Sequence, residues 1–399
     1  MGGFKSLLYS NIPPLKLNEG QITLSEKIKE SMRQSDSVYI ATGYASKKSL
    51  IELNSLVQEY NIKKIILVLG MYCIEGFPES IYNTAISIHE EWMEKQIGEI
   101  RITPSIKYHG KVYSFYRDGT VFNAMIGSHN LGALVLDANN RRQYELSINI
   151  TDKATLDEVD SHLQQLIKTP ASISISDVPD ITIIHEENEK LRGVEGVVKI
   201  SKDEVTSFKD ALQNIEFTIP LKVPGIPGAR EDYMKSNINK CYAKGRENKR
   251  TKVITERGWW ETEVIVSKKI TNSPNYPEKG KPFYVITDDG WKFKAHVAGD
   301  GKKNFESHDD LKILGYWLKG RLVAAGFVEP VDSPAKDLAN ICEDSLNAYK
   351  KCKGVITYKM LEKYGRTELT FAKTTKTMSD EDDANLDVWV LSFLPNNVK

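Results

Sequence analysis

The first 170 residues alternate apolar, strand-like runs with helix-like segments, and this alternation most narrowly limits the fold. Ser37–Tyr44 and Lys63–Met71 are short runs rich in β-branched residues, as in buried strands. Between them, Leu50, Leu53 and Leu56 recur at helical spacing. The pattern continues with expected helices over Ser80–Glu99 and Leu156–Lys168, and with expected strands over Glu99–Thr103, Lys111–Arg117, Thr120–Ser128 and Gln143–Thr151. Strands separated by helices predict an α/β sandwich.

The pattern changes near Thr169, where a segment rich in Ser, Pro and Asp is followed by a charged run. We therefore expect a first domain over residues 1–170, a linker over 171–205 and a second domain over 206–399. The second part has short strand-like runs broken by turns, with helical pieces at Asp309–Ala324 and Ser333–Lys351. This rhythm is typical of a small, mostly-β barrel or sandwich.

The composition restricts where a nucleic acid could bind. Lysine plus arginine and aspartate plus glutamate both number 54, so the formal net charge is zero and any nucleic-acid surface must be local. Four scattered cysteines form no CxxC pair, which fits neither a zinc site nor a disulfide framework. No apolar run approaches the roughly 20 residues that span a bilayer. We expect a cytoplasmic protein with no metal, no cofactor and no membrane partner.

The segment Tyr108–Asn130 carries two short polar motifs joined by a hairpin. His109-x-Lys111 precedes the Asp118-Gly119 turn, and Gly127-Ser128-x-Asn130 follows it. In a paired hairpin, these side chains would lie near one another on neighbouring strands. Either motif alone is weak evidence for a functional site, because HxK arises by chance and GSxN is often only a turn. Their ordered combination favours a functional cluster.

This cluster suits attack on a phosphodiester without a metal ion. A neutral imidazole at His109 can act as the nucleophile and form a covalent phospho-histidine. Lys111, Ser128 and Asn130 would supply charge and hydrogen bonds to the phosphate oxygens. A carboxylate behind the imidazole would fix its tautomer, and Glu145 is the best-placed candidate. His129 should point away from the others and have a structural role.

The HxK…GSxN pattern resembles the motif of the phospholipase D superfamily, most closely in the nuclease half of the NgoFVII/BfiI-type restriction endonucleases. The resemblance implies that His109 is the nucleophile and that Lys111, Ser128 and Asn130 hold the phosphate. It also implies that Glu145 lies behind the His109 imidazole. Members of the superfamily often carry an aspartate where this chain has Tyr116. Asp118 is near that position, and its ability to replace the missing aspartate is left open.

The superfamily reaction needs two such clusters, because the leaving oxygen must receive a proton from the side opposite the nucleophile. This chain has one cluster and no internal repeat. A symmetric homodimer in which the two His109 side chains meet would supply both. Such a dimer has a single catalytic centre, so it would cut the two DNA strands in sequence.

A local basic segment, Lys222–Lys252, indicates a DNA-binding surface in the second half. It carries nine basic and three acidic residues in a neutral protein, among them Lys222 and Arg230. Lysine and arginine neutralise phosphates, and arginine and asparagine can read base edges. The alternative is a solvated charged face, which is common for a charge run. A nuclease upstream favours DNA.

This half also resembles the C-terminal domain of the same endonucleases, a plant B-three-type DNA-binding pseudobarrel. The matching pieces are SNINKCYAKGR, PFYVITDDGWKFKAHVAGDGKKNFES and LKILGYWLKGRL. The resemblance implies two arms that hold DNA. The first would include Asn237, Asn239, Lys244 and Arg246, and the second Lys302, Lys303 and Asn304.

These observations predict a restriction endonuclease that reads a short sequence in double-stranded DNA and cuts outside it. The chain has no P-loop, so any ATP dependence would require a separate translocase subunit. One alternative is a DNA-binding regulator whose nuclease fold only dimerises. Another is a phospholipid-acting enzyme, which the lack of an apolar interfacial face disfavours.

Overall fold

A computed structural model of the protein describes residues 6–10, 17–135, 144–223, 237–243, 245–247, 250–339, 353–380 and 385–395. The chain forms two compact units, Met1–Glu186 and Glu187–Lys399. The division falls inside the segment expected to be a linker. That segment is not free of structure, however, since its first part pairs with strands of the first unit and its last part joins the second.

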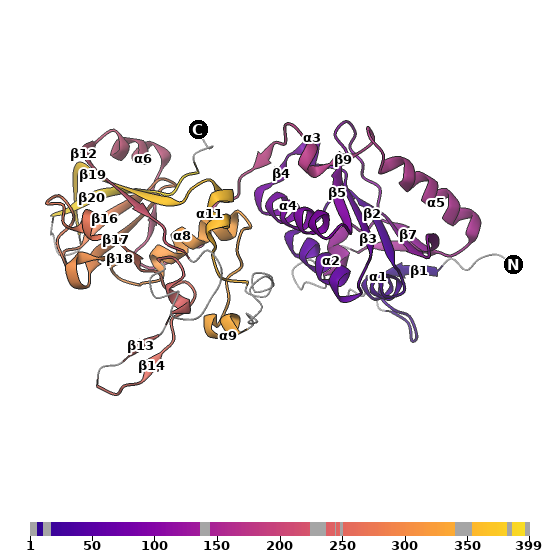
Figure 1. Ribbon diagram of the computed structural model, residues 1–399. Helices are drawn as coiled ribbons and strands as arrows, with labels where there is room; N and C mark the ends of the chain where they lie inside the picture. Colours follow the sequence, from indigo (N-terminus) through magenta and orange to yellow (C-terminus); the bar gives the residue numbers. More distant parts are fainter. Residues whose placement is uncertain are drawn as a thin grey trace. The chain divides into compact units, whose positions relative to one another are not determined.

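The first unit is built on an eight-stranded mixed sheet with the order β1-β8-β7-β6-β2-β3-β5-β9 (Figure 1). Strands β2, β3 and β5 are parallel, and the other neighbours in this sheet are antiparallel. The strands are β1 (Ser6–Tyr9), β2 (Ser37–Thr42), β3 (Lys64–Leu69), β5 (Gly98–Ile102), β6 (Val112–Arg117), β7 (Thr120–Gly127), β8 (Leu146–Ile150) and β9 (Ile173–Ser174). A separate parallel pair joins β4 (Phe77–Pro78) to β10 (Ile183–Ile184).

Helices cover both faces of this sheet, as the α/β sandwich requires. Leucine, isoleucine and aromatic side chains of α1, α2 and α4 pack against one face, and α5 packs against the other. The helices are α1 (Leu24–Arg33), α2 (Lys47–Glu59), α3 (Tyr72–Glu75), α4 (Glu79–Glu94) and α5 (Lys153–Leu166), with the 3-10 turns η1 (Leu131–Leu134) and η3 (Ile175–Asp177). The predicted fold class of the first half is confirmed.

The hairpin β6–β7 forms where the Asp-Gly pair predicts it. Asp118 and Gly119 both have positive φ, +49° and +74°, as in the turns that match the twist of paired strands. Strand β6 starts only at Val112, however. His109 and Lys111 therefore lie in the extended segment that precedes the strand.

The second unit is a β-rich domain whose main sheet has the order β12-β19-β20-β16-β17-β18-β15, with β11 paired to β17. Its strands are β11 (Val198–Lys199), β12 (Leu212–Pro220), β15 (Val264–Ile265), β16 (Phe283–Thr287), β17 (Trp291–Ala298), β18 (Asn304–Ser307), β19 (Glu368–Ser379) and β20 (Asn385–Ser392). Its helices are α6 (Lys202–Lys209), α7 (Lys268–Thr271), α8 (Ile313–Ala324), α9 (Pro334–Ala339) and α11 (Tyr358–Tyr364), with the 3-10 turns η5 (Lys240–Tyr242) and η6 (Asp300–Lys302). The mostly-β prediction for this half is also confirmed.

Tryptophan and phenylalanine side chains fill the core of this domain. Trp259, Trp317 and Trp389 are each at most 2% exposed. A two-stranded ribbon, β13 (Arg246–Glu247) with β14 (Ile254–Thr255), projects from the domain (Figure 1). Within the described residues, no helix has the length and apolar character needed to cross a membrane.

Candidate active site and DNA-binding face

An irregular segment after β5 carries His109 to the carboxyl end of β3. The backbone N–H of Tyr108 donates to the carbonyl of Gly70 at 2.9 Å, and the Thr103 hydroxyl donates to the same carbonyl at 2.9 Å. A Cβ atom at Gly70 would lie 2.0 Å from the carbonyl oxygen of Tyr108. Only glycine therefore allows this close approach, which fixes the backbone next to His109.

His109 and Asn130 meet at Gly43, the residue that follows β2 by one position. A Cβ atom at Gly43 would lie 2.9 Å from Cδ2 of His109 and 3.5 Å from Oδ1 of Asn130. The side-chain oxygen Oδ1 of Asn130 accepts hydrogen bonds from the Thr42 hydroxyl and the Tyr44 backbone N–H, both at 3.2 Å. The structure thus brings the two predicted motifs together across the end of the central strands, with the Asn130 amide oriented by its oxygen.

Lys111 is buried beside His109. Its side chain is 5% exposed, and its ammonium donates to the backbone carbonyl of His109 at 2.6 Å. Burial lowers the pKa of Lys111, and the charge of Glu145 opposes this shift. A desolvated cation at the backbone of His109 is suited to phosphate oxygens, because Coulomb attraction strengthens as water is excluded.

Glu145 contacts Ser128 rather than the imidazole. The Ser128 hydroxyl donates to Oε2 of Glu145 at 2.5 Å and accepts from the backbone N–H of Leu146 at 3.0 Å. Among the described residues, no hydrogen bond joins Glu145 to His109. The expectation that Glu145 stands behind the imidazole is therefore wrong for this structure, because the start of β8 places its carboxylate over the serine.

His129 lies beneath the cluster, as its position between Ser128 and Asn130 predicts. It is fully buried, its Nδ1 shares a hydrogen bond with the Ser147 hydroxyl, and its ring stacks on Tyr113 at 4.5 Å. Burial, together with the charge of Lys111, lowers the pKa of His129 to about 3. The ring is thus held neutral, which agrees with a structural role.

A second polar group beside His109 has no counterpart in the predicted site. The Tyr44 hydroxyl donates to Glu75 at 2.5 Å, and the Lys107 ammonium donates to the same carboxylate at 3.1 Å. The ring of Tyr44 meets that of His109 edge-on at 5.9 Å. The hydrogen bonds from Tyr44 and Lys107 lower the pKa of Glu75, and the charges of Lys107 and His109 add to this effect. No sequence motif marks Glu75.

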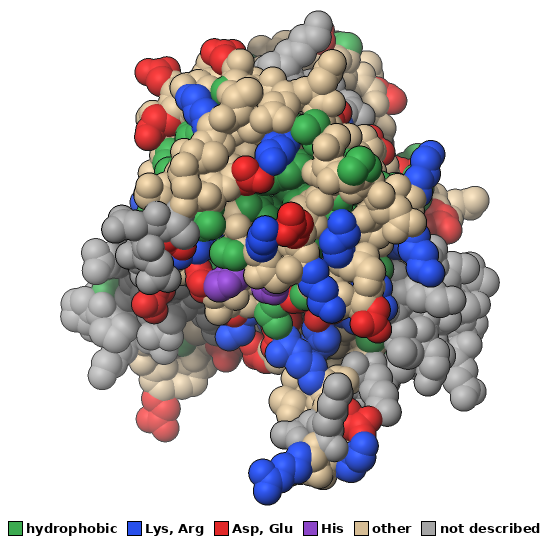
Figure 2. All heavy atoms as spheres, turned by 90° about the vertical axis from the view of Figure 1, so that its left-hand side faces the viewer, with side chains coloured by type: hydrophobic (Ala, Val, Ile, Leu, Met, Phe, Trp, Pro, Cys, Tyr) green, Lys and Arg blue, Asp and Glu red, His purple; other side chains and the backbone are tan. Residues whose placement is uncertain are grey.

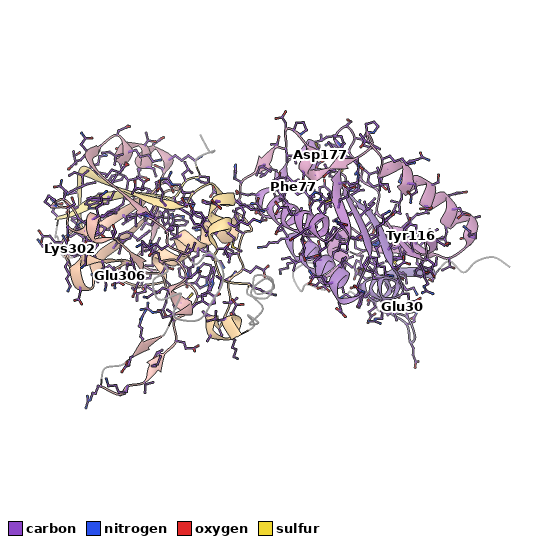
Figure 3. All side chains as sticks on the ribbon, in the orientation of Figure 1. Glu30, Phe77, Tyr116, Asp177, Lys302 and Glu306 are labelled. Atoms are coloured by element: carbon purple, nitrogen blue, oxygen red, sulfur yellow. The ribbon has the colours of Figure 1, made fainter. Side chains whose placement is uncertain are left out.

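Asp118 does not replace the missing motif aspartate. It sits in the turn after β6, at the opposite end of that strand from Lys111. Tyr116, at the motif position, is buried and its hydroxyl donates to Asp160 at 2.7 Å (Figure 3). Position 116 therefore serves packing against α5 and takes no part in the cluster.

Two asparagines expected to contact DNA are instead internal. Asn237 and Asn239 are 0% and 1% exposed. The Asn237 amide bonds the backbone of Pro220 and Ile265, and the Asn239 amide bonds both backbone groups of Ile356. Both predictions are corrected, because these side chains satisfy buried backbone groups and cannot reach a base.

The remaining predicted arm residues that the structure describes lie at the surface. Arg246 is on β13 and pairs with Glu261. Lys302, Lys303 and Asn304 follow one another into β18, with Lys302 at a φ of +56°. Lys222 is exposed after β12. The predictions for Arg230 and Lys244 lie outside the described residues.

Known family models match both halves of the chain. The model of the NgoFVII restriction endonuclease N-terminal PLD domain matches residues 22–180, and that of the NgoFVII C-terminal B3-like DNA-binding domain matches residues 208–352. No curated protein sequence gives a significant match. One solved structure that is similar is a phosphatidylserine synthase from Haemophilus influenzae, with 15% identity and a TM-score of 0.30 over 44% of this chain and 41% of that chain. The chain belongs to the NgoFVII restriction endonuclease family, with a phospholipase D-type domain followed by a B3-like DNA-binding domain.

Proposed function

We propose that the protein is a DNA endonuclease that cleaves phosphodiester bonds without a metal ion, through a phospho-histidine at His109. The observation that carries this proposal is the convergence of His109 and Asn130 on Gly43, with Lys111 bonded to the carbonyl of His109. A nucleophile with phosphate-binding groups beside it is what such a reaction requires. Membership of the family supports the same activity.

The chemistry has two balanced steps. In the first, a ring nitrogen of neutral His109 forms a bond to phosphorus, and the bond from phosphorus to the leaving sugar oxygen breaks as that oxygen takes a proton from an acid. In the second, water gives its proton to the group that acted as the acid in the first step, bonds to phosphorus and releases the neutral imidazole. Lys111, Ser128 and the Asn130 amide nitrogen hold the non-bridging oxygens, on which negative charge gathers in both steps.

A second copy of the chain would provide the acid. An apolar surface, defined by Leu7, Ile126, Leu146 and Ile148, lies on β1, β8 and β7, and these side chains are between 37% and 56% exposed. Leu7, Ile148 and Ile126 are direct partners across the three strands, so they share one face. Exposed apolar side chains in a row are typical of an interaction surface.

This surface adjoins the proposed catalytic cluster. Ile126 precedes Ser128 by two residues, and Leu146 directly follows Glu145. A two-fold axis through the surface would therefore bring the two clusters toward each other. One His109 would attack while His109 of the partner subunit protonates the leaving oxygen, so the dimer cuts one strand at a time.

The C-terminal domain would hold the DNA. It binds DNA as a B3-like domain, and we propose that it reads a short sequence so that cleavage falls outside that sequence. Arg246 on the projecting ribbon and Lys302, Lys303 and Asn304 at the start of β18 carry the proposed phosphate and base contacts, with Lys222, Arg230 and Lys244 from the basic segment. A separate ATP-dependent translocase subunit remains a proposed partner.

The test compares wild type with His109→Ala on DNA that the C-terminal domain binds, in excess EDTA. We expect wild type to cleave in EDTA, and the variant to bind equally well without cleaving. Loss of wild-type cleavage in EDTA would overturn the histidine mechanism. If both proteins bind DNA and neither cleaves under any condition, the alternative of a DNA-binding regulator is correct.

A further inference from the structure

Because Asn237 and Asn239 are buried, any base reading by this domain must come from other side chains. Buried and partly exposed side chains alternate strictly along β17. Those of Trp291, Phe293, Ala295 and Val297 are buried, and those between them face outward. We call the outward side chains Lys292, Lys294 and His296, with Asn304 and Glu306 of β18, the outer face. Histidines lie among basic and acidic side chains on the face of this domain shown in Figure 2.

Glu306 is the acidic member of this outer face. It is the direct cross-strand partner of His296, and Asn304 precedes it by two residues on the same strand. The proposed second-arm lysines, Lys302 and Lys303, come just before β18, and Figure 3 labels Glu306 and Lys302 within the same domain. A carboxylate here weakens phosphate binding, because it repels the DNA backbone.

Among the described residues, no arginine or lysine forms an ion pair with Glu306. Its side chain is 11% exposed, and Nε2 of His296 lies 3.3 Å from its Oε1. The nearby Arg257 is paired with Glu263 at 3.1 Å, and Arg246 is paired with Glu261. Burial and the charge of Glu263 raise the pKa of Glu306, and the charges of Arg257 and Arg246 offset this shift only in part.

The imidazole of His296 lies beside this carboxylate, but the two groups do not have hydrogen-bond geometry. Its Nδ1 is buried and has no partner among the described residues. Burial and the charge of His308 lower the pKa of His296, which favours the neutral ring. Among the described residues, no hydrogen bond reaches the Glu306 carboxylate, so its lone pairs are available to a donor from outside.

We propose that Glu306, beside His296 on the neighbouring strand, is a base-reading acceptor that takes the exocyclic amino group of a cytosine in the major groove. This inference rests on the proposed DNA-binding role of the domain. Among the bases, cytosine offers only a donor on its major-groove edge. Adenine places its N7 acceptor beside the amino group, and that lone pair repels a carboxylate. A desolvated carboxylate thus gains most from cytosine.

The test is a selection of bound duplexes from a random-sequence library, using the full chain. Wild type should require a G·C pair in one orientation at a fixed position. In Glu306→Gln the preference at that position should fall about tenfold or more, while the other positions stay unchanged. Glu278→Gln, which removes an exposed carboxylate paired with Lys281, is the charge-matched control and should leave every position unchanged.

A change in the DNA tests the same contact. Replacing the required cytosine by a pyrimidinone that lacks the 4-amino group should weaken wild-type binding about tenfold and Glu306→Gln binding little. An unchanged preference in Glu306→Gln, or equal losses in both proteins, would overturn the proposal. If wild type selects no sequence at all, the sequence-reading role of the domain fails instead, and the two failures are distinguishable.

Discussion

The hydroxyl of Ser128 donates a 2.5 Å hydrogen bond to the carboxylate of Glu145. Because the backbone N–H of Leu146 donates to the same hydroxyl, the oxygen of Ser128 is fixed between two groups of β8. The carboxylate therefore contacts the serine that we propose binds phosphate, and its charge also acts on Lys111.

The effects of changes at these two residues should not add. Ser128→Ala should lower the cleavage rate about 100-fold, as loss of a preorganised donor does. Glu145→Gln should lower it by a smaller factor, and the double variant should resemble Ser128→Ala alone. Single-turnover rates on cognate DNA measure this. Multiplicative losses would show that Glu145 also acts independently of Ser128, for example through the charge of Lys111.

The close approach at Gly43 gives a second prediction. A methyl group there would lie 2.9 Å from the His109 ring and 3.2 Å from the side chain of Met71, so the imidazole must move. Gly43→Ala should therefore cost about 100-fold in cleavage rate, the typical effect of a displacement near 1 Å. Gly132→Ala is the matched control, because nothing lies within 4 Å of its added carbon. Equal activity of the two variants would contradict the proposed position of His109.

Glu75 should influence catalysis through Tyr44 and His109. Glu75→Gln removes the carboxylate that accepts from Tyr44 and Lys107, and it should lower kcat about fivefold while DNA affinity stays unchanged. Glu30→Gln removes a similar carboxylate, paired with Lys27 on α1, and should have no effect. A loss of affinity with unchanged kcat would instead indicate a DNA contact.

The apolar surface on β1, β7 and β8 predicts a dimer that one charge can dissociate. Ile148→Asp places a carboxylate at its centre and should convert a sedimenting dimer into a monomer that binds DNA without cleaving it. Met93→Asp changes a 53% exposed residue of α4 and should stay dimeric. A monomer of either variant that still cleaves would remove the shared-site argument.

His129 makes the stability of the first domain depend on pH. Its pKa of about 3 in the folded chain lies below the unfolded value of 6.5, so the unfolded state binds the extra proton. The resulting loss in the free energy of unfolding is negligible well above pH 6.5 and grows as the pH falls to about 3. At pH 5 it should reach about 2 kcal/mol. Denaturant unfolding of wild type and His129→Gln should show this loss only in wild type.

Sequence patterns predicted the parts of the molecule that depend on local signals. The Asp118-Gly119 turn, the strands around it and the two-part fold follow from turn chemistry and hydrophobic alternation. Strands β19 and β20 were not predicted. In β19, threonine and lysine side chains replace most of the apolar residues that would mark a strand.

The site details that were missed depend on tertiary placement. Glu75 reaches the cluster only because the ends of β2 and β3 lie side by side. Asn237 and Asn239 have the residue type of base readers, but the fold uses them to satisfy buried backbone groups. No sequence spacing distinguishes these two uses of an amide.

The stereochemistry at phosphorus tests the central claim most directly. Cleavage of a phosphorothioate of known configuration, in water labelled with ¹⁸O, reports the number of displacements. Two displacements, first by His109 and then by water, each invert the phosphorus, so the account predicts overall retention of configuration. Overall inversion would show a single attack by water and would contradict a phospho-histidine intermediate.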